Sequence, residues 1–283
     1  MVVSPCGDVL LNMKNRIGLE TVEFEPKKKH YKPAGFGNAL SAHYEYVERG
    51  RCPWNYRPAG SAITLPESLK PYPRLCLQAA SPLAFEGLLP TFGAAIALDV
   101  SEIAYEVTYS ASRDLVAVPE EHTDLEKVLF SEILKKFSCH TIMSVSVSAE
   151  DPLLIQEILT LLTKYDCERY VYFSSKSKGV LKLLSTIAPQ YPTCYCTVKL
   201  DDNSISDACS LGCKKIQFHD SECSNDMVAL AHSRGLLCNM LYNRSEVDMK
   251  QHCDLNIDTL VVEHYNLISQ FIEISKKCFD YSL

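Results

Sequence analysis

From residue 74 onward, short apolar runs alternate with amphipathic segments along the chain. Several runs lack the apolar–polar alternation of a half-buried strand, which is typical of parallel strands buried on both faces. The expected strands are Arg74–Gln78, Ala95–Val100, Leu115–Val118, Thr141–Val147, Tyr170–Phe173, Thr193–Val198, Lys215–Phe218, Leu236–Leu241 and Thr259–Val262. Strands that alternate with helices predict parallel neighbours joined by crossover connections.

The segments between these strands carry the end signals of helices, namely capping residues before the apolar face and Gly or Pro after it. The expected helices run from the capping box Thr123-Asp124-Leu125-Glu126 to Phe137, from Asp151-Pro152 to Leu162, and over Lys176–Ala188, Asn225–Arg234 and Tyr265–Lys277. A (β/α)₈ TIM-type barrel has eight strands, so nine candidates favour this fold if one of them belongs to a hairpin or is not a strand. A doubly wound open sheet is the alternative, although no glycine-rich phosphate loop follows any strand.

The first part of the chain has a different character. Eight of the 14 prolines lie at or before Pro73, the stretch lacks a sustained period, and it holds the one tryptophan, Trp54. It is not polar enough to be called wholly disordered. The sequence therefore predicts an irregular N-terminal extension over residues 1–72 and a barrel over residues 73–283.

Composition narrows the function classes. The net charge of −7 disfavours nucleic-acid binding, which needs Lys/Arg surfaces, and the basic run at 27–30 is interpreted as a solvated stretch. No apolar stretch approaches about 18 residues and no signal peptide is recognised, so we expect no membrane span and a cytoplasmic protein. The 13 scattered cysteines predict reduced core residues, and Cys209 and Cys213 lack a second pair at zinc spacing.

Five segments in order resemble the glycerophosphodiester phosphodiesterase family, nearest the animal lysophospholipase-D-like branch. They are "GAAIALDV" (93–100), similar to a strand "GAD-x-IELDV", "TDLEKVL" (123–129), "MSVSVS" (143–148), similar to "MSVEIK", "YVYFSSKSKGVLKLLSTIAPQYP" (170–192) and the tail at 231–268. The resemblance implies a TIM-type barrel that cleaves glycerol phosphodiesters with Ca²⁺ or Mg²⁺. It also implies two catalytic histidines at the carboxyl ends of strands.

Several positions that match the family's catalytic motifs hold other residues. Gln78 stands where the family's first strand ends in a catalytic histidine, and Pro119 stands where the second histidine is expected. Glu120 follows Pro119, and His122 lies two or three residues beyond the expected place. An amide cannot exchange a proton near neutral pH, so this alignment removes both members of the acid/base pair.

The metal ligands are depleted in the same alignment. The family's Glu-x-Asp pair becomes Ala97 and Asp99, and its Glu-x-Lys pair becomes Ser146 and Ser148. A hard divalent ion held by Asp99 alone would bind poorly, because such ions need several charged oxygens. Each lost acid/base group typically supplies about 10² to 10⁴ in rate.

The first hypothesis is therefore a catalytically degenerate barrel with a binding or scaffolding role and no cofactor. A phosphodiester or lysophospholipid is its expected ligand, and residues 1–72 are a candidate site for a protein partner. In this family's setting, Lys176 and Asn243 are candidate substrate-binding residues. A solvent-facing lysine at a helix start and a helix-capping asparagine are the competing interpretations.

Two alternatives stay open. In the first, the chain is an active phosphoric diester hydrolase of lipid metabolism. Its Ca²⁺ or Mg²⁺ would lie in a site rebuilt from Asp99, Glu120, His122 and a histidine of the extension, such as His30 or His43. In the second, the chain is an unrelated barrel enzyme with its own chemistry. Against the rebuilt site, a strand-end aspartate often caps the next loop, and acids before a helix favour its N-terminus. The other histidines are expected on a loop, in the pair at 219–220, or on helix surfaces, at 232 and 252.

Overall fold

The computed structural model describes residues 2–3, 9–11, 73–80, 85, 87–98, 100–119, 127–138, 141–219, 223–242, 249–253 and 255–278. The chain divides into two compact units, Met1–Gly35 and Phe36–Leu283. In the first unit, strand β1 (Val2–Val3) pairs antiparallel with β2 (Val9–Leu11). The predicted boundary at residue 72 lies outside the described residues.

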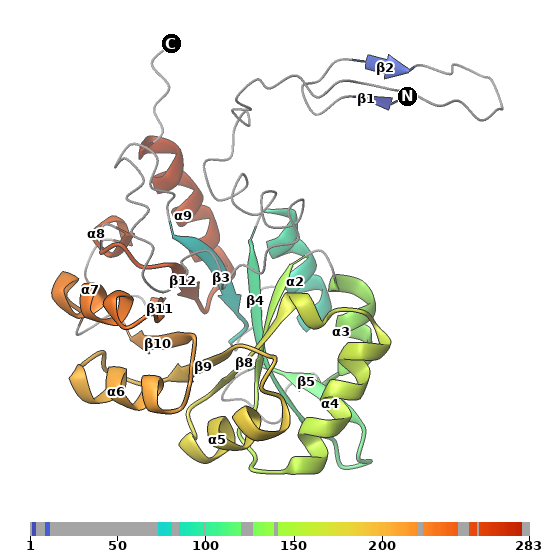
Figure 1. The fold of residues 1–283 in the computed structure, drawn as a ribbon. Coiled ribbons are helices and arrows are strands. Elements are labelled where there is room, and N and C mark those ends of the chain that lie inside the picture. Colours follow the sequence, from blue (N-terminus) through green and yellow to red (C-terminus); the bar gives the residue numbers. More distant parts are fainter. Residues whose placement is uncertain are drawn as a thin grey trace. The chain divides into compact units, whose positions relative to one another are not determined.

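The second unit contains a closed barrel of eight parallel strands, seen in Figure 1. In barrel order the strands are β3 (Arg74–Gln78), β4 (Glu102–Tyr109), β7 (Ile142–Ser146), β8 (Val171–Ser175), β9 (Thr193–Cys196), β10 (Lys215–His219), β11 (Leu237–Tyr242) and β12 (Thr259–Val262). Each strand pairs in parallel with the next, and β12 pairs with β3 to close the circle. This confirms the predicted TIM-type barrel and rules out the open sheet.

Helices surround the barrel on its outside (Figure 1). They are α2 (Leu88–Ala97), α3 (Phe130–Phe137), α4 (Pro152–Lys164), α5 (Lys178–Ile187), α6 (Asp202–Ser210), α7 (Asn225–Ser233), α8 (Met249–Cys253) and α9 (Tyr265–Cys278), with a 3₁₀ turn at Glu168–Tyr170. Within the described part of the chain, none of them is both long and apolar enough to cross a membrane.

Local sequence signals explain several helix ends. The Asp151 carboxylate accepts a 2.9 Å hydrogen bond from the Leu153 N–H, and Pro152 opens α4, as expected. Asp201 and Ser204 form a reciprocal capping box at α6, a helix that the apolar pattern did not indicate. Gly235 takes φ = 81° just after α7, a conformation that favours glycine.

The predicted strand Ala95–Val100 is wrong. Residues 88–97 form α2, which buries Leu88, Thr91, Phe92 and Ala95 at helical spacing. The short run of small apolar residues fits either element, and the spacing back to Leu88 distinguishes them. The second barrel strand is β4, which begins five residues after α2 ends.

A hairpin branches from the barrel wall at β4. Strand β5 (Leu115–Val118) pairs antiparallel with β4, and β6 (Val128–Leu129) pairs antiparallel with β5. Val128 and Leu129 were expected inside a helix, but that helix, α3, begins only at Phe130. The proposed capping box at 123–126 lies outside the described residues.

Candidate functional site

The two faces of the barrel strands have different chemistry. One face of each strand packs against the helices in the main apolar core, as Leu75, Leu77, Ile103 and Tyr105 do. The alternate residues face the barrel interior, where small groups such as Cys76, Ala104, Leu241 and Val261 contact one another. The inward residues at the carboxyl ends of the strands form the barrel mouth, which is where TIM-barrel sites are built.

At the mouth, Gln78 is joined to a second amide. The Gln217 Nε2 donates a 3.1 Å hydrogen bond to the Gln78 Oε1, and both residues are less than 9% exposed. Their strands, β3 and β10, are not neighbours in the barrel, so this bond spans its interior. The position expected for a catalytic histidine is thus held by a neutral side chain whose carbonyl is already engaged.

The pair expected at Ala97 and Asp99 needs correction because the second barrel strand lies elsewhere. Ala97 is the last residue of α2, and Asp99 lies outside the described residues. On β4, the inward positions nearest the mouth are Ala104 and Glu106, in register with Ser144 and Ser146 of β7. One carboxylate still occupies this part of the mouth, but it belongs to Glu106, which the sequence analysis missed.

The serines of β7 form part of a hydroxyl cluster. The Ser144 Oγ donates to the Ser174 Oγ on β8 at 3.1 Å, while Ser175 donates to the Val147 carbonyl at 2.7 Å. Ser146 is buried at 9% exposure and is in register with Ser174. Neutral hydroxyls therefore line β7 and β8, where the resemblance leads one to expect a carboxylate and a lysine.

The remaining predicted site residues are only partly placed. Pro119 is buried directly after β5, whereas Glu120, His122 and Asn243 lie outside the described residues. Lys176 is exposed between β8 and α5, immediately before Ser177, which caps α5.

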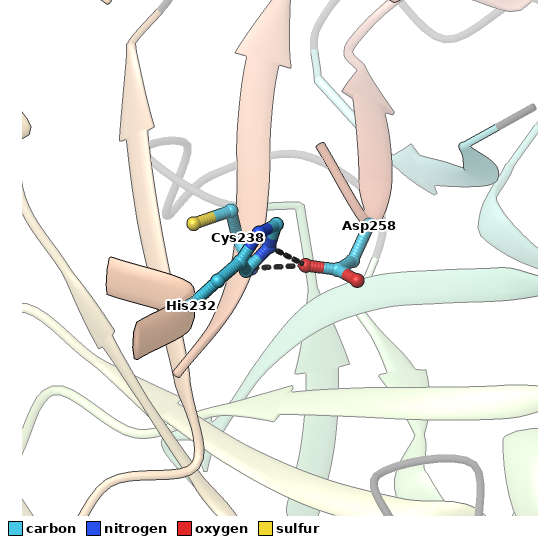
Figure 2. Close-up of side chains that lie close together, drawn as sticks. All are labelled: His232, Cys238 and Asp258. Carbon is cyan, nitrogen blue, oxygen red and sulfur yellow. Dashed lines mark hydrogen bonds and ion pairs between the residues drawn. The ribbon is translucent and has the colours of Figure 1, made fainter. Parts of the chain in front are cut away.

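Three histidines differ from expectation. His219 was assigned to a loop, but it is the last residue of β10, half-buried and facing inward at the mouth. His252 is only 4% exposed and packs edge-on against the Tyr242 ring. His232, expected on a helix surface, bonds to Asp258 at 2.7 Å (Figure 2). His219 reaches the mouth because it is the last of the inward positions of β10, and its place in the sequence after an apolar run did not show this.

Deeper in the barrel, the first residues of three strands form a charged cluster. Glu102 and Lys215 are fully buried, with the Lys215 Nζ 3.1 Å from the Glu102 Oε2, and the Arg74 Nη1 lies 3.3 Å from the Glu102 Oε1. Tyr172 donates to Glu102 at 3.0 Å, and its ring lies 4.0 Å from the Lys215 Nζ. The Thr259 Oγ1 lies 3.5 Å from the same carboxylate.

This cluster sets the protonation of its members. Burial by itself raises the pKa of Glu102, but Lys215 and then Arg74 offset that effect, so the Glu102 pKa lies below its usual value. Burial, reinforced by the Glu102 charge, raises the pKa of Tyr172 well above the usual value. Glu102 is therefore ionised and Tyr172 neutral near pH 7.

The fold and the mouth define the class of protein: a TIM-type barrel whose candidate site lies at the carboxyl ends of its strands. No protein-family profile matches the sequence, and no curated protein matches it either. Many solved structures do match it, and several of them are described as glycerophosphodiester phosphodiesterases.

Three of these structures illustrate the likeness. The enzyme from Thermotoga maritima is 13% identical with a TM-score of 0.56 over 71% of this chain and 98% of its own. One from Parabacteroides distasonis is 11% identical, TM-score 0.57, over 87% and 94%. A phosphodiesterase from Oleispira antarctica, solved with the product sn-glycerol-3-phosphate, is 13% identical, TM-score 0.59, over 71% and 97%. At these identities the likeness establishes the fold.

Proposed function

We propose that this chain is a glycerophosphodiester phosphodiesterase-like barrel that binds a phosphodiester-type ligand without hydrolysing it. The observation that carries the proposal is the amide pair across the mouth. Gln78 holds the expected place of a catalytic histidine, and its amide oxygen accepts a hydrogen bond from Gln217. An amide cannot act as a general acid or base near neutral pH.

The surrounding mouth supports the same conclusion. Ala104, Ser144, Ser146 and Ser174 present no carboxylate, and a calcium or magnesium site needs several charged oxygens. Among the inward residues of the barrel strands themselves, Glu106 supplies a carboxylate and His219 an imidazole. A phosphodiester-type ligand is supported by the Oleispira antarctica phosphodiesterase, which holds sn-glycerol-3-phosphate on the same fold.

The test compares the purified full chain with the Thermotoga maritima enzyme as a positive control. Glycerophosphocholine and lysophosphatidylcholine are supplied with Ca²⁺ or Mg²⁺, and release of choline is followed. We expect no release above the blank, and no change in melting temperature on adding either metal. We also expect sn-glycerol-3-phosphate to raise the melting temperature equally with and without metal.

If the chain is instead an active phosphodiesterase, it should hydrolyse these substrates when metal is present. Metal-dependent turnover that disappears in Glu106→Gln, in His219→Gln or in Asp99→Ala would establish a rebuilt catalytic site and overturn the proposal. These variants separate the two functions, because each replaces a titrating group with a neutral one of similar or smaller size.

A further inference from the structure

Three potential metal ligands converge at the end of the barrel opposite the mouth. His232 lies in the last turn of α7, Cys238 is the second residue of β11, and Asp258 immediately precedes β12. The imidazole, thiol and carboxylate ligand atoms all lie within 4.8 Å of one another. Figure 2 shows the three side chains between a helix and two strands, with Asp258 bonded to both His232 and the Cys238 backbone. From these residues the geometry points to a zinc-type site at the base of the barrel.

Hydrogen bonding orients the carboxylate for this role. The Asp258 Oδ2 accepts the Cys238 backbone N–H at 2.8 Å and lies 2.7 Å from the His232 Nε2. The backbone bond holds the carboxylate in place, as the outer partners of metal ligands do. In a tetrahedral site with ligand bonds of about 2.0 to 2.3 Å, neighbouring ligand atoms lie roughly 3.3 to 3.7 Å apart. The His232–Asp258 contact would need to open by less than about 1 Å.

Charge balance favours a divalent ion here. The His232 and Asp258 side chains are 12% and 11% exposed, and Cys238 is fully buried. A dication bound by a thiolate, a carboxylate and a neutral imidazole has no net charge, so no uncompensated charge is buried. Because these two side chains keep some contact with solvent, the expected fourth ligand is water.

The ligand types select the metal. A thiolate with an imidazole suits zinc and other borderline or soft ions, whereas calcium and magnesium prefer all-oxygen ligands. The site therefore differs in chemistry as well as in place from the mouth, and it does not depend on the function proposed there. Binding converts the Cys238 thiol to a thiolate and releases its proton to the buffer.

The experiment titrates Zn²⁺ into chelator-treated full-length protein by calorimetry, in two buffers of different ionisation enthalpy. We expect one saturable ion per chain, proton release on binding, and a higher melting temperature with Zn²⁺ but not with Ca²⁺ or Mg²⁺. Co²⁺ in place of Zn²⁺ should give a thiolate-to-metal absorption band.

Variants identify the ligands. His232→Gln and Asp258→Asn keep groups that can hydrogen-bond across the same gap, but each should weaken zinc binding by more than the about 10- to 100-fold typical of outer-shell changes. Cys238→Ser should abolish the cobalt–thiolate band. Cys76→Ser, at a buried thiol inside the barrel, should change neither the zinc affinity nor this band. Urea unfolding establishes that each variant is folded. Zinc binding of equal affinity and stoichiometry in the wild type and all three ligand variants would overturn the site, as would an absence of binding to the wild type.

Discussion

Glu102 and Lys215 give a prediction whose sign depends on the charge count inside the barrel. Arg74 and Lys215 each contribute +1 and Glu102 contributes −1, so the buried cluster carries a net charge of +1. Glu102→Gln leaves two cations with no anion, and removing one partner of a buried pair costs about 3–5 kcal/mol. Lys215→Met leaves Glu102 paired with Arg74 and bonded to Tyr172, so it loses mainly one charged hydrogen-bonding partner, worth about 1.5–3 kcal/mol.

We therefore expect Glu102→Gln to be the more destabilising of the two, in urea unfolding at pH 7 with similar m-values. Lys178→Met is the matched control, because Lys178 pairs with Asp207 on the exposed surface, where solvent screens the interaction. The reasoning fails if Lys215→Met destabilises the protein as much as Glu102→Gln does, or if Glu102→Gln behaves like the control.

The same cluster predicts a dependence on pH. Because the folded-state pKa of Glu102 lies below the usual 4.5, its ionisation stabilises the folded state fully above that value. This contribution is lost as the pH falls from 4.5 through the lower folded-state pKa. Glu102→Gln should flatten this acid limb of the stability curve, measured by urea unfolding at each pH.

Three further predictions concern the helix layer. Ile155→Ala, at a fully buried site, should cost about 2–5 kcal/mol in urea unfolding, whereas Leu153→Ala on the same helix, at a side chain that is 58% exposed, should change little; equal costs would contradict the assigned burial. Asp151→Ala should cost about 1 kcal/mol through loss of the α4 cap, and Asp151→Asn should restore most of it if capping is the cause. Gly179→Ala should gain up to about 1 kcal/mol, and more of it when Glu150 is also Ala, because the added Cβ meets the Glu150 carboxylate, which must then move; an equal gain in both backgrounds would exclude that clash.

The sequence predicted the barrel because buried parallel strands and amphipathic helices leave separate periodic signals. The strands at 74–78, 115–118 and 259–262 were predicted at their observed bounds. The failure at residues 95–100 has a physical cause: a short run of Ala, Ile and Leu satisfies a buried helix and a buried strand alike. Length and the spacing from Leu88 decide between them, and only the strand pairing shows this directly.

The candidate site was harder to predict than the fold, because its membership depends on register between distant strands. Gln78 and Gln217 are 139 residues apart, and no spacing in the sequence indicates their bond. Glu106 was missed because the strand that carries it was placed seven residues too early, at 95–100 rather than 102–109. A resemblance in short motifs therefore located the right part of the chain but placed its second barrel strand too early.

The interior of the barrel separates the demands of folding from those of chemistry. At the first residues of their strands, Arg74 and Lys215 both pair with Glu102. The charges needed for phosphodiester hydrolysis would lie at the other ends, where Gln78 and Ser146 are neutral. Changes at the mouth consequently leave the buried ion pairs intact, so the fold can persist whichever chemistry the mouth supports. Exchanging Glu102 should disturb folding, whereas exchanging Glu106 at the mouth should leave the free energy of unfolding nearly unchanged. If Glu106→Gln destabilised the protein as much as Glu102→Gln does, this separation would be wrong.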